Sequence, residues 1–97
     1  MHIIARSTLQ QFWEHHPDSK QSLMAWFKEA EHASWRSFEE IKKRYSSADH
    51  LHDNRVVFNI KGGNYRLIVK IHYNTGKVFI RFIGTHDEYN RIDAETI

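Results

Sequence analysis

The residues best suited to chemistry are basic and lie in the second half of the chain. Between residues 55 and 86 there are six lysines and arginines and no aspartate or glutamate. Arginine binds phosphate oxygens through a planar fork of donors, and an imidazole, which ordinarily titrates near pH 6.5, exchanges protons at neutral pH. Metal-free RNA cleavage needs a base for the 2′-hydroxyl, cations for the charge that develops on phosphorus, and an acid for the 5′ oxygen. Arg66, Lys61 and His86 could supply these groups, and Tyr89 could bind a phosphate or stack on a base.

Three predicted strands must position these side chains. Residues 55–61, 65–74 and 77–85 are rich in Val, Ile, Phe and Tyr, and glycine-containing turns separate them, which is typical of a hairpin-connected meander. Side chains alternate between the two faces of a strand, so in the third strand we expect Val78, Ile80 and Phe82 in the core. The opposite face is predicted to be open, basic and free of acid, with Phe79 and Ile83 exposed on it. Its polar members are Asn59, Lys61, Arg66, Lys70 and Arg81.

This basic face has two interpretations with similar weight on spacing alone. Cations interleaved with an aromatic side chain are suited to phosphates and to bases that stack, which predicts RNA contacts by Arg55, Lys70, Arg81 and Phe79. The alternative is an ordinary solvated sheet face that lysine and arginine keep soluble.

The first half of the chain predicts a short strand and helices. Residues 2–5 could form an edge strand, and Ser7 or Thr8 could begin a helix that Pro17 ends. A second helix is expected over 18–33, and a third from Ser37 to about Tyr45, followed by a loop over 46–54. Helices followed by a meander predict one α+β domain over 1–97, with two to three helices packed on an antiparallel sheet of three to four strands. Trp13, Trp26 and Trp35 are expected in its core.

Composition excludes several classes of protein. The chain has 97 residues, a formal net charge of +2 and no cysteine, and no apolar run is long enough to span a bilayer. The start MHIIAR has too short an apolar run for a signal peptide, so a cytoplasmic protein without a membrane partner is expected. The pairs His15-His16 and His50-x-His52 lack the further ligands of a metal site, and the turn at Lys61-Gly62-Gly63 is not a P-loop. No metal and no cofactor is predicted.

The most specific stretch runs over residues 57–89, VFNIKGGNYRLIVKIHYNTGKVFIRFIGTHDEY. It resembles the core of the HigB toxin family, ribosome-dependent messenger RNA endonucleases within the RelE-like superfamily. Residues 1–54 agree with that family only in element order. The resemblance implies a microbial-ribonuclease-like fold, a concave basic sheet that takes messenger RNA in the ribosomal decoding site, and a co-encoded HigA-type antitoxin with a helix-turn-helix.

The resemblance also implies roles for individual residues. Arg66 matches the arginine that holds the scissile phosphate, and His86 and Tyr89 match the C-terminal catalytic positions, with Lys61 and Asn59 beside them. RelE has a lysine pair on the strand before the turn, where this chain has Val57 and Asn59, so the general base is left open.

Two rival functions remain open on the sequence. The same basic face could belong to a non-catalytic module that holds RNA or a ribosomal element, although a titratable His86 among the arginines favours catalysis. A protein-binding scaffold is the third interpretation, with the acidic tail, Phe79 and Ile83 as its contact surface.

Overall fold

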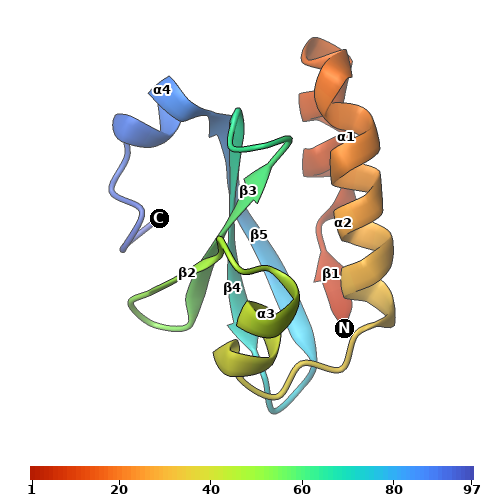
Figure 1. The fold of residues 1–97 in the computed structure, drawn as a ribbon, viewed down its shortest axis with the longest axis vertical. Coiled ribbons are helices and arrows are strands. Elements are labelled where there is room, and N and C mark those ends of the chain that lie inside the picture. Colours follow the sequence, from red (N-terminus) through yellow and green to blue (C-terminus); the bar gives the residue numbers. More distant parts are fainter.

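A mixed five-stranded sheet forms the frame of the molecule in the computed structural model, which describes residues 1–97 (Figure 1). Its strands are β1 (His2–Ile4), β2 (Asp49–Leu51), β3 (Arg55–Ile60), β4 (Tyr65–His72) and β5 (Lys77–Thr85). They lie in the order β1-β5-β4-β3-β2, with β1 parallel to β5 and the other neighbours antiparallel. The predicted edge strand is confirmed as β1, but it makes the sheet mixed rather than antiparallel.

The fifth strand comes from a segment that the sequence predicts to be loop. Residues 49–51 pair with 55–57 of β3 to form β2. The segment lacks the run of branched and aromatic residues that marks a strand, and its pairing depends on the neighbouring edge of β3. The prediction of three to four strands was therefore one strand short.

Helices cover one side of the sheet. They are α1 (Arg6–His15), a 3₁₀ turn η1 (Pro17–Ser19), α2 (Lys20–His32) and α3 (Phe38–Arg44), and a short α4 (His86–Asn90) follows β5. Pro17 sits at the first position of η1, where its missing N–H costs nothing, and so re-aims the chain between α1 and α2. The α+β class and the three helices predicted before the meander are confirmed.

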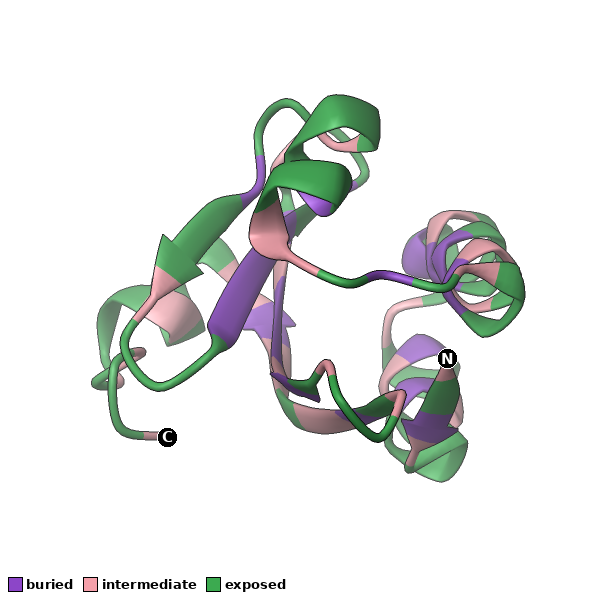
Figure 2. Ribbon diagram, turned by 90° about the horizontal axis from the view of Figure 1, so that it is seen from below, coloured by how far each residue is buried: buried purple, intermediate pink, exposed green.

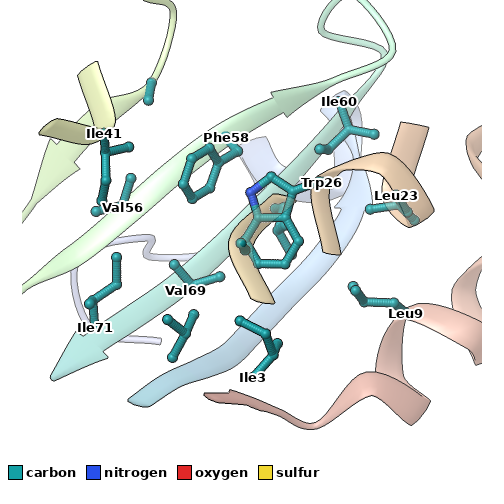
Figure 3. Close-up of a cluster of buried hydrophobic side chains, with 14 of the residues drawn as sticks. Ile3, Leu9, Leu23, Trp26, Ile41, Val56, Phe58, Ile60, Val69 and Ile71 are labelled. Atoms are coloured by element: carbon teal, nitrogen blue, oxygen red, sulfur yellow. The ribbon is translucent and has the colours of Figure 1, made fainter. Parts of the chain in front are cut away.

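The main core lies between these helices and the sheet. Leu23, Trp26 and Ala30 of α2 pack on strand residues that include Phe58, and Ile41 of α3 joins them (Figure 3). Trp13, Trp26 and Trp35 all belong to this cluster, as predicted. Figure 2 shows the buried residues along the central strands and on the inner sides of the helices.

A β-bulge changes the face to which part of β5 belongs. Val69 of β4 pairs with Ile80, whereas Ile68 pairs with Phe82, so Arg81 is an extra residue in β5. One extra residue reverses the alternation beyond it. Ile83 accordingly packs against the helix-side core, and Phe82 lies on the other face. The sequence-based placement of Phe82 in the core and of Ile83 on the basic face was wrong.

The opposite face is not open along its whole length, because residues 91–97 fold back over it. In Figure 1 this segment lies on the side of the sheet away from α1 and α2. The Arg55 side chain donates to the carbonyl oxygens of Ile97 (2.7 Å) and Thr96 (3.1 Å), and the His52 N–H donates to Glu95 Oε2 (2.6 Å). The prediction of an open face is therefore wrong in the region that this segment covers.

Arg55 is part of the interior rather than of an exposed basic surface. The residue is 7% exposed, and its guanidinium also donates to the carbonyl oxygen of His52. Val57 and Ile68 are buried on the same face of the sheet as Arg55, although neither belongs to the helix-side core. An RNA-binding role for Arg55 stays a prediction that this burial disfavours.

Replacing Arg55 by alanine should lower the free energy of unfolding by about 1.5 to 3 kcal/mol, because buried hydrogen bonds from a charged donor are lost. For a domain of this size the melting temperature should fall by on the order of 10 °C, measured by circular dichroism. Arg81→Ala is the matched control, since Arg81 is exposed and makes one 3.3 Å bond to the same segment. Equal melting temperatures for the two variants would contradict the structural role of Arg55.

Candidate RNA-binding site

The end of β5 presents a short helix in a fixed orientation. Thr85 is the N-cap of α4: its hydroxyl accepts from the Glu88 N–H (3.2 Å), and its own N–H donates to Glu88 Oε1 (2.8 Å). The pKa of Glu88 lies below its usual value, mainly because the Thr85 N–H donates to its carboxylate and then because of the Thr85 hydroxyl. Burial acts in the opposite direction but is outweighed. This capping box makes His86 the first residue of α4.

Arg66 lies beside this helix in the middle strand β4. The register places it opposite Asn59 of β3 and Gly84 of β5. Its guanidinium carbon is 5.8 Å from the centre of the Tyr89 ring, within cation–π range. His86 and Tyr89 are three residues apart on α4, and residues at this spacing share a helix face. The structure thus brings Arg66 and Tyr89 into contact, with His86 on the same face of α4.

Arg66 is held by the backbone and not by an acid. Its Nη1 donates to the carbonyl oxygen of Gly63, and it takes part in none of the four ion pairs of the structure. A guanidinium fixed by one carbonyl keeps most of its donors available for a phosphate.

The turn between β3 and β4 supplies that carbonyl. Lys61, Gly62 and Gly63 have positive φ values of 52°, 65° and 95°. A Cβ on Gly63 would lie 3.2 Å from Arg66 Nη1, whereas a Cβ on Gly62 would meet nothing within 4 Å. The positive φ values favour glycine at both positions. Only at Gly63 would a side chain also collide with the Arg66 guanidinium.

Gly63→Ala should lower RNA cleavage by about tenfold or more, because its Cβ displaces the Arg66 guanidinium from its fixed position. Gly62→Ala is the matched control: it carries a similar backbone penalty but no contact with Arg66. Rates should be compared at a temperature where circular dichroism shows both variants folded. Equal losses in the two variants would mean that the turn affects only stability.

Two of the other cations pair with acids that are distant in sequence. Lys61 Nζ is 3.0 Å from Asp18 Oδ2, and Lys70 Nζ is 2.7 Å from Asp53 Oδ2. Lys70 lowers the pKa of Asp53 by a hydrogen bond and by its charge. The prediction of an acid-free face was therefore wrong. Residues 55–86 contain no acid, but the fold brings Asp18 and Asp53 from outside this stretch to Lys61 and Lys70. Partly exposed pairs of this kind are weak, about 0.2 to 1 kcal/mol, so a polyanion can compete for both lysines.

Asp18 and Tyr65 belong to this corner of the molecule and were missed as site residues. The Tyr65 hydroxyl donates to Asp18 Oδ1 at 2.5 Å. The hydroxyl of Tyr65 and then the ammonium of Lys61 hold the pKa of Asp18 below its usual value, and the Asp18 carboxylate raises the pKa of Tyr65. Asp18 lies 43 residues before Lys61 in the chain, so no local signal could have shown that it orients this lysine.

The remaining predicted residues lie at two ends of the face. Asn59 is exposed beside Arg66, and its Nδ2 donates to the carbonyl oxygen of Ser47 (3.3 Å).

Lys70 lies four residues after Arg66 along β4, about 13 Å away at strand spacing. Half-buried Phe79 lies opposite Lys70 and has its ring 5.0 Å from that of His72. Asn59, Lys61, Arg66, His86 and Tyr89 thus lie at the α4 end, hereafter the α4-end site, while Lys70 and Phe79 lie at the opposite end.

The fold and this site define a small α+β protein with a backbone-held arginine, a histidine and a tyrosine at one end of its sheet. The chain belongs to the HigB toxin family, described as the RelE-like toxic component of a toxin–antitoxin system, whose family model matches residues 19–92.

Relatives in this family cover almost the whole chain. It is 28% identical over 96 residues to the mRNA interferase toxin HigB of Escherichia coli strain K12, an alignment that covers 97% of this chain and 92% of the relative. The mRNA interferase HigB of Shigella flexneri matches at the same identity and coverage. A further mRNA interferase HigB, from Escherichia coli O6:H1, is 21% identical over 94 residues, 95% of this chain and 91% of the relative. None of the helices is long and apolar enough to cross a membrane.

Proposed function

We propose that this protein is a ribosome-dependent endoribonuclease that cleaves translated messenger RNA and so stops translation and growth. The observation that carries the proposal is Arg66, a cation without an acidic partner, held by the glycine turn against Tyr89, with His86 on the same helix. The family match and the printed names of the relatives support the same activity.

The reaction needs only side-chain groups at the α4-end site. Arg66 binds the scissile phosphate and stabilises the charge that develops on it. The 2′-hydroxyl attacks phosphorus, the bond to the 5′ oxygen breaks, and His86 transfers a proton in this exchange, leaving a 2′,3′-cyclic phosphate and a 5′-hydroxyl. Lys61 adds positive charge, and Asn59 hydrogen-bonds the RNA beside Arg66. Tyr89 orients the guanidinium and offers its ring to a base.

Lys70, Arg81 and Phe79 extend the contact along the RNA. Lys70 and Arg81 bind flanking phosphates, and Phe79 stacks on a base. The ribosome supplies the message in the decoding site.

A HigA-type antitoxin with a helix-turn-helix is the expected partner in the cytoplasm. Phe79 remains an apolar anchor for it on the basic face, whereas Ile83 does not, because the bulge turns Ile83 into the core. Co-expression with each adjacent reading frame, followed by pull-down, tests this partner. Continued toxicity with every neighbour would count against it.

Primer extension on a translated message after induction of the protein tests the proposed activity. New 5′ ends should appear within the reading frame with the wild type and be absent with Arg66→Ala. A message whose start codon is removed controls for translation. Growth arrest without new ends would contradict cleavage and favour a non-catalytic RNA- or ribosome-binding module.

A further inference from the structure

The path that the proposed function gives to the RNA is covered between Arg66 and Lys70. These two residues alternate along β4 with residues of the helix-side core, so they lie on the other face, with Ile68 between them. Ile68 is 0% exposed, and Val57, its partner on β3, is 4% exposed, although neither belongs to the helix-side core. RNA that contacts both Arg66 and Lys70 therefore has to cross a covered stretch of the sheet.

Residues 91–97 form this cover. Arg55 Nε of β3 (2.7 Å) and Arg81 Nε of β5 (3.3 Å) both donate to the carbonyl oxygen of Ile97. Because β4 lies between β3 and β5, the segment lies across β4. Figure 1 shows it on the side of the sheet away from α1 and α2, which is the face that carries Arg66.

The segment carries negative charge on its outer side. Ile92, Ala94 and Ile97 are half-buried, whereas Asp93 and Glu95 are exposed. The apolar residues are thus the more buried ones, and the two acids face solvent. Like charges repel, so two carboxylates over the path disfavour an RNA phosphate there as long as the segment stays in place.

Few bonds hold the segment to the sheet. No backbone group of residues 93–97 pairs with the backbone of a strand. The bonds that hold it are those from Arg55 and Arg81 to carbonyl oxygens and one from the His52 N–H to Glu95 Oε2 (2.6 Å). Segments with so few contacts open locally at a small part of the free energy of global unfolding. A phosphate oxygen is also a stronger acceptor for arginine than a neutral carbonyl oxygen, so RNA can take the place of the segment on both guanidinium groups.

We propose that residues 91–97 are a strap that blocks the RNA path in the free protein, and that RNA displaces it and binds a phosphate between Arg55 and Arg81. The free protein holds its own carbonyl oxygens where the phosphate oxygens of the substrate go. Arg55 is buried while the strap is closed and becomes available to RNA when the strap opens. The inference rests on the proposed function, because it adds a second phosphate site and a competitor for RNA to the same sheet face.

Binding of a 2′-O-methyl oligouridylate tests the strap, because this probe has no 2′-hydroxyl to attack phosphorus and is not cut. Glu95→Ala removes the acceptor of the His52 N–H and should bind the probe about fivefold more tightly than wild type, the value of one hydrogen bond. Glu95→Gln loses the charge but keeps an acceptor oxygen, so its gain in affinity should be smaller.

Glu14→Ala is the matched control for Glu95→Ala. It removes an exposed carboxylate from α1, which lies on the other side of the sheet, so it should bind the probe as wild type does. A gain for Glu95→Ala no larger than that for Glu95→Gln would overturn the proposal, because the effect would then be one of charge alone. A lack of binding by Glu95→Ala would overturn it as well.

Nuclear magnetic resonance of the backbone N–H groups separates this inference from the proposed function. Order parameters of residues 93–97 report their motion on the picosecond-to-nanosecond timescale. Adding the same probe should lower these order parameters to those of a flexible chain and leave those of β4 unchanged. Opening of the strap without cleavage of a translated message by the wild type would retain the strap and reject the nuclease. Cleavage with a strap that stays ordered on the bound probe would reject the strap alone.

Discussion

Replacing Arg66 by alanine is expected to reduce cleavage of a ribosome-bound message by about 100- to 1,000-fold. The loss of one preorganised charged donor to a transition state costs about 3 to 4 kcal/mol. Arg66 fits this role better than Lys61 or Lys70, because those lysines are paired with Asp18 and Asp53 while Arg66 is bound only to a carbonyl and lies against Tyr89. The measurement is the single-turnover rate, with growth arrest after induction as a second readout.

Arg81→Ala is the matched control for Arg66→Ala. Arg81 is an exposed arginine at the bulge of β5, so its loss should weaken binding of RNA and leave the single-turnover rate at saturation within about tenfold of wild type. Arg66→Lys should recover only part of the lost rate, because an ammonium cannot form the bidentate fork. Full toxicity of Arg66→Ala with an unchanged melting curve would show that Arg66 is not catalytic.

Replacing His86 by alanine is expected to reduce the rate by about 100- to 10,000-fold, the usual range for general acid–base catalysis. His86 opens α4, on the helix face from which Tyr89 contacts Arg66. Its substitution should leave α4 in place, because the helix is capped by Thr85 and Glu88 and not by the imidazole. A loss of rate without a loss of melting temperature would therefore report on chemistry.

His72→Ala is the control for His86→Ala. His72 is exposed at the far end of β4, where it pairs with Lys77 and its ring lies against Phe79. Six residues of strand separate it from Arg66, about 20 Å at strand spacing. Its substitution should change the rate little. If the effects of the two substitutions were exchanged, the catalytic centre would lie at the opposite end of the sheet.

Local patterns predicted the parts of the site that depend on neighbouring residues. The glycine turn after Lys61 follows from a short stretch of sequence, and so does the alternation that places Arg66 on the face opposite the core. The helix expected over residues 18–33 is likewise present as the end of η1 and α2, with Trp26 in the core as predicted.

Features that depend on distant residues could not be predicted in this way. The bulge at Arg81 is set by how β5 pairs with β4, and it reversed the faces of Phe82 and Ile83. The burial of Arg55 depends on carbonyl groups of residues 96 and 97, more than 40 positions away. A basic stretch without acids in the sequence therefore did not predict an open or acid-free surface.

The nature of the new RNA ends tests the central claim most directly. A purified ribosome complex with a defined message is treated with the wild-type protein, and the 3′ end of the upstream fragment is analysed. Attack by the 2′-hydroxyl, with Arg66 on the phosphate and His86 transferring the proton, predicts a 2′,3′-cyclic phosphate and a 5′-hydroxyl on the downstream fragment. A 3′-hydroxyl with a 5′-phosphate would contradict this mechanism and the assignment of the α4-end site as its centre.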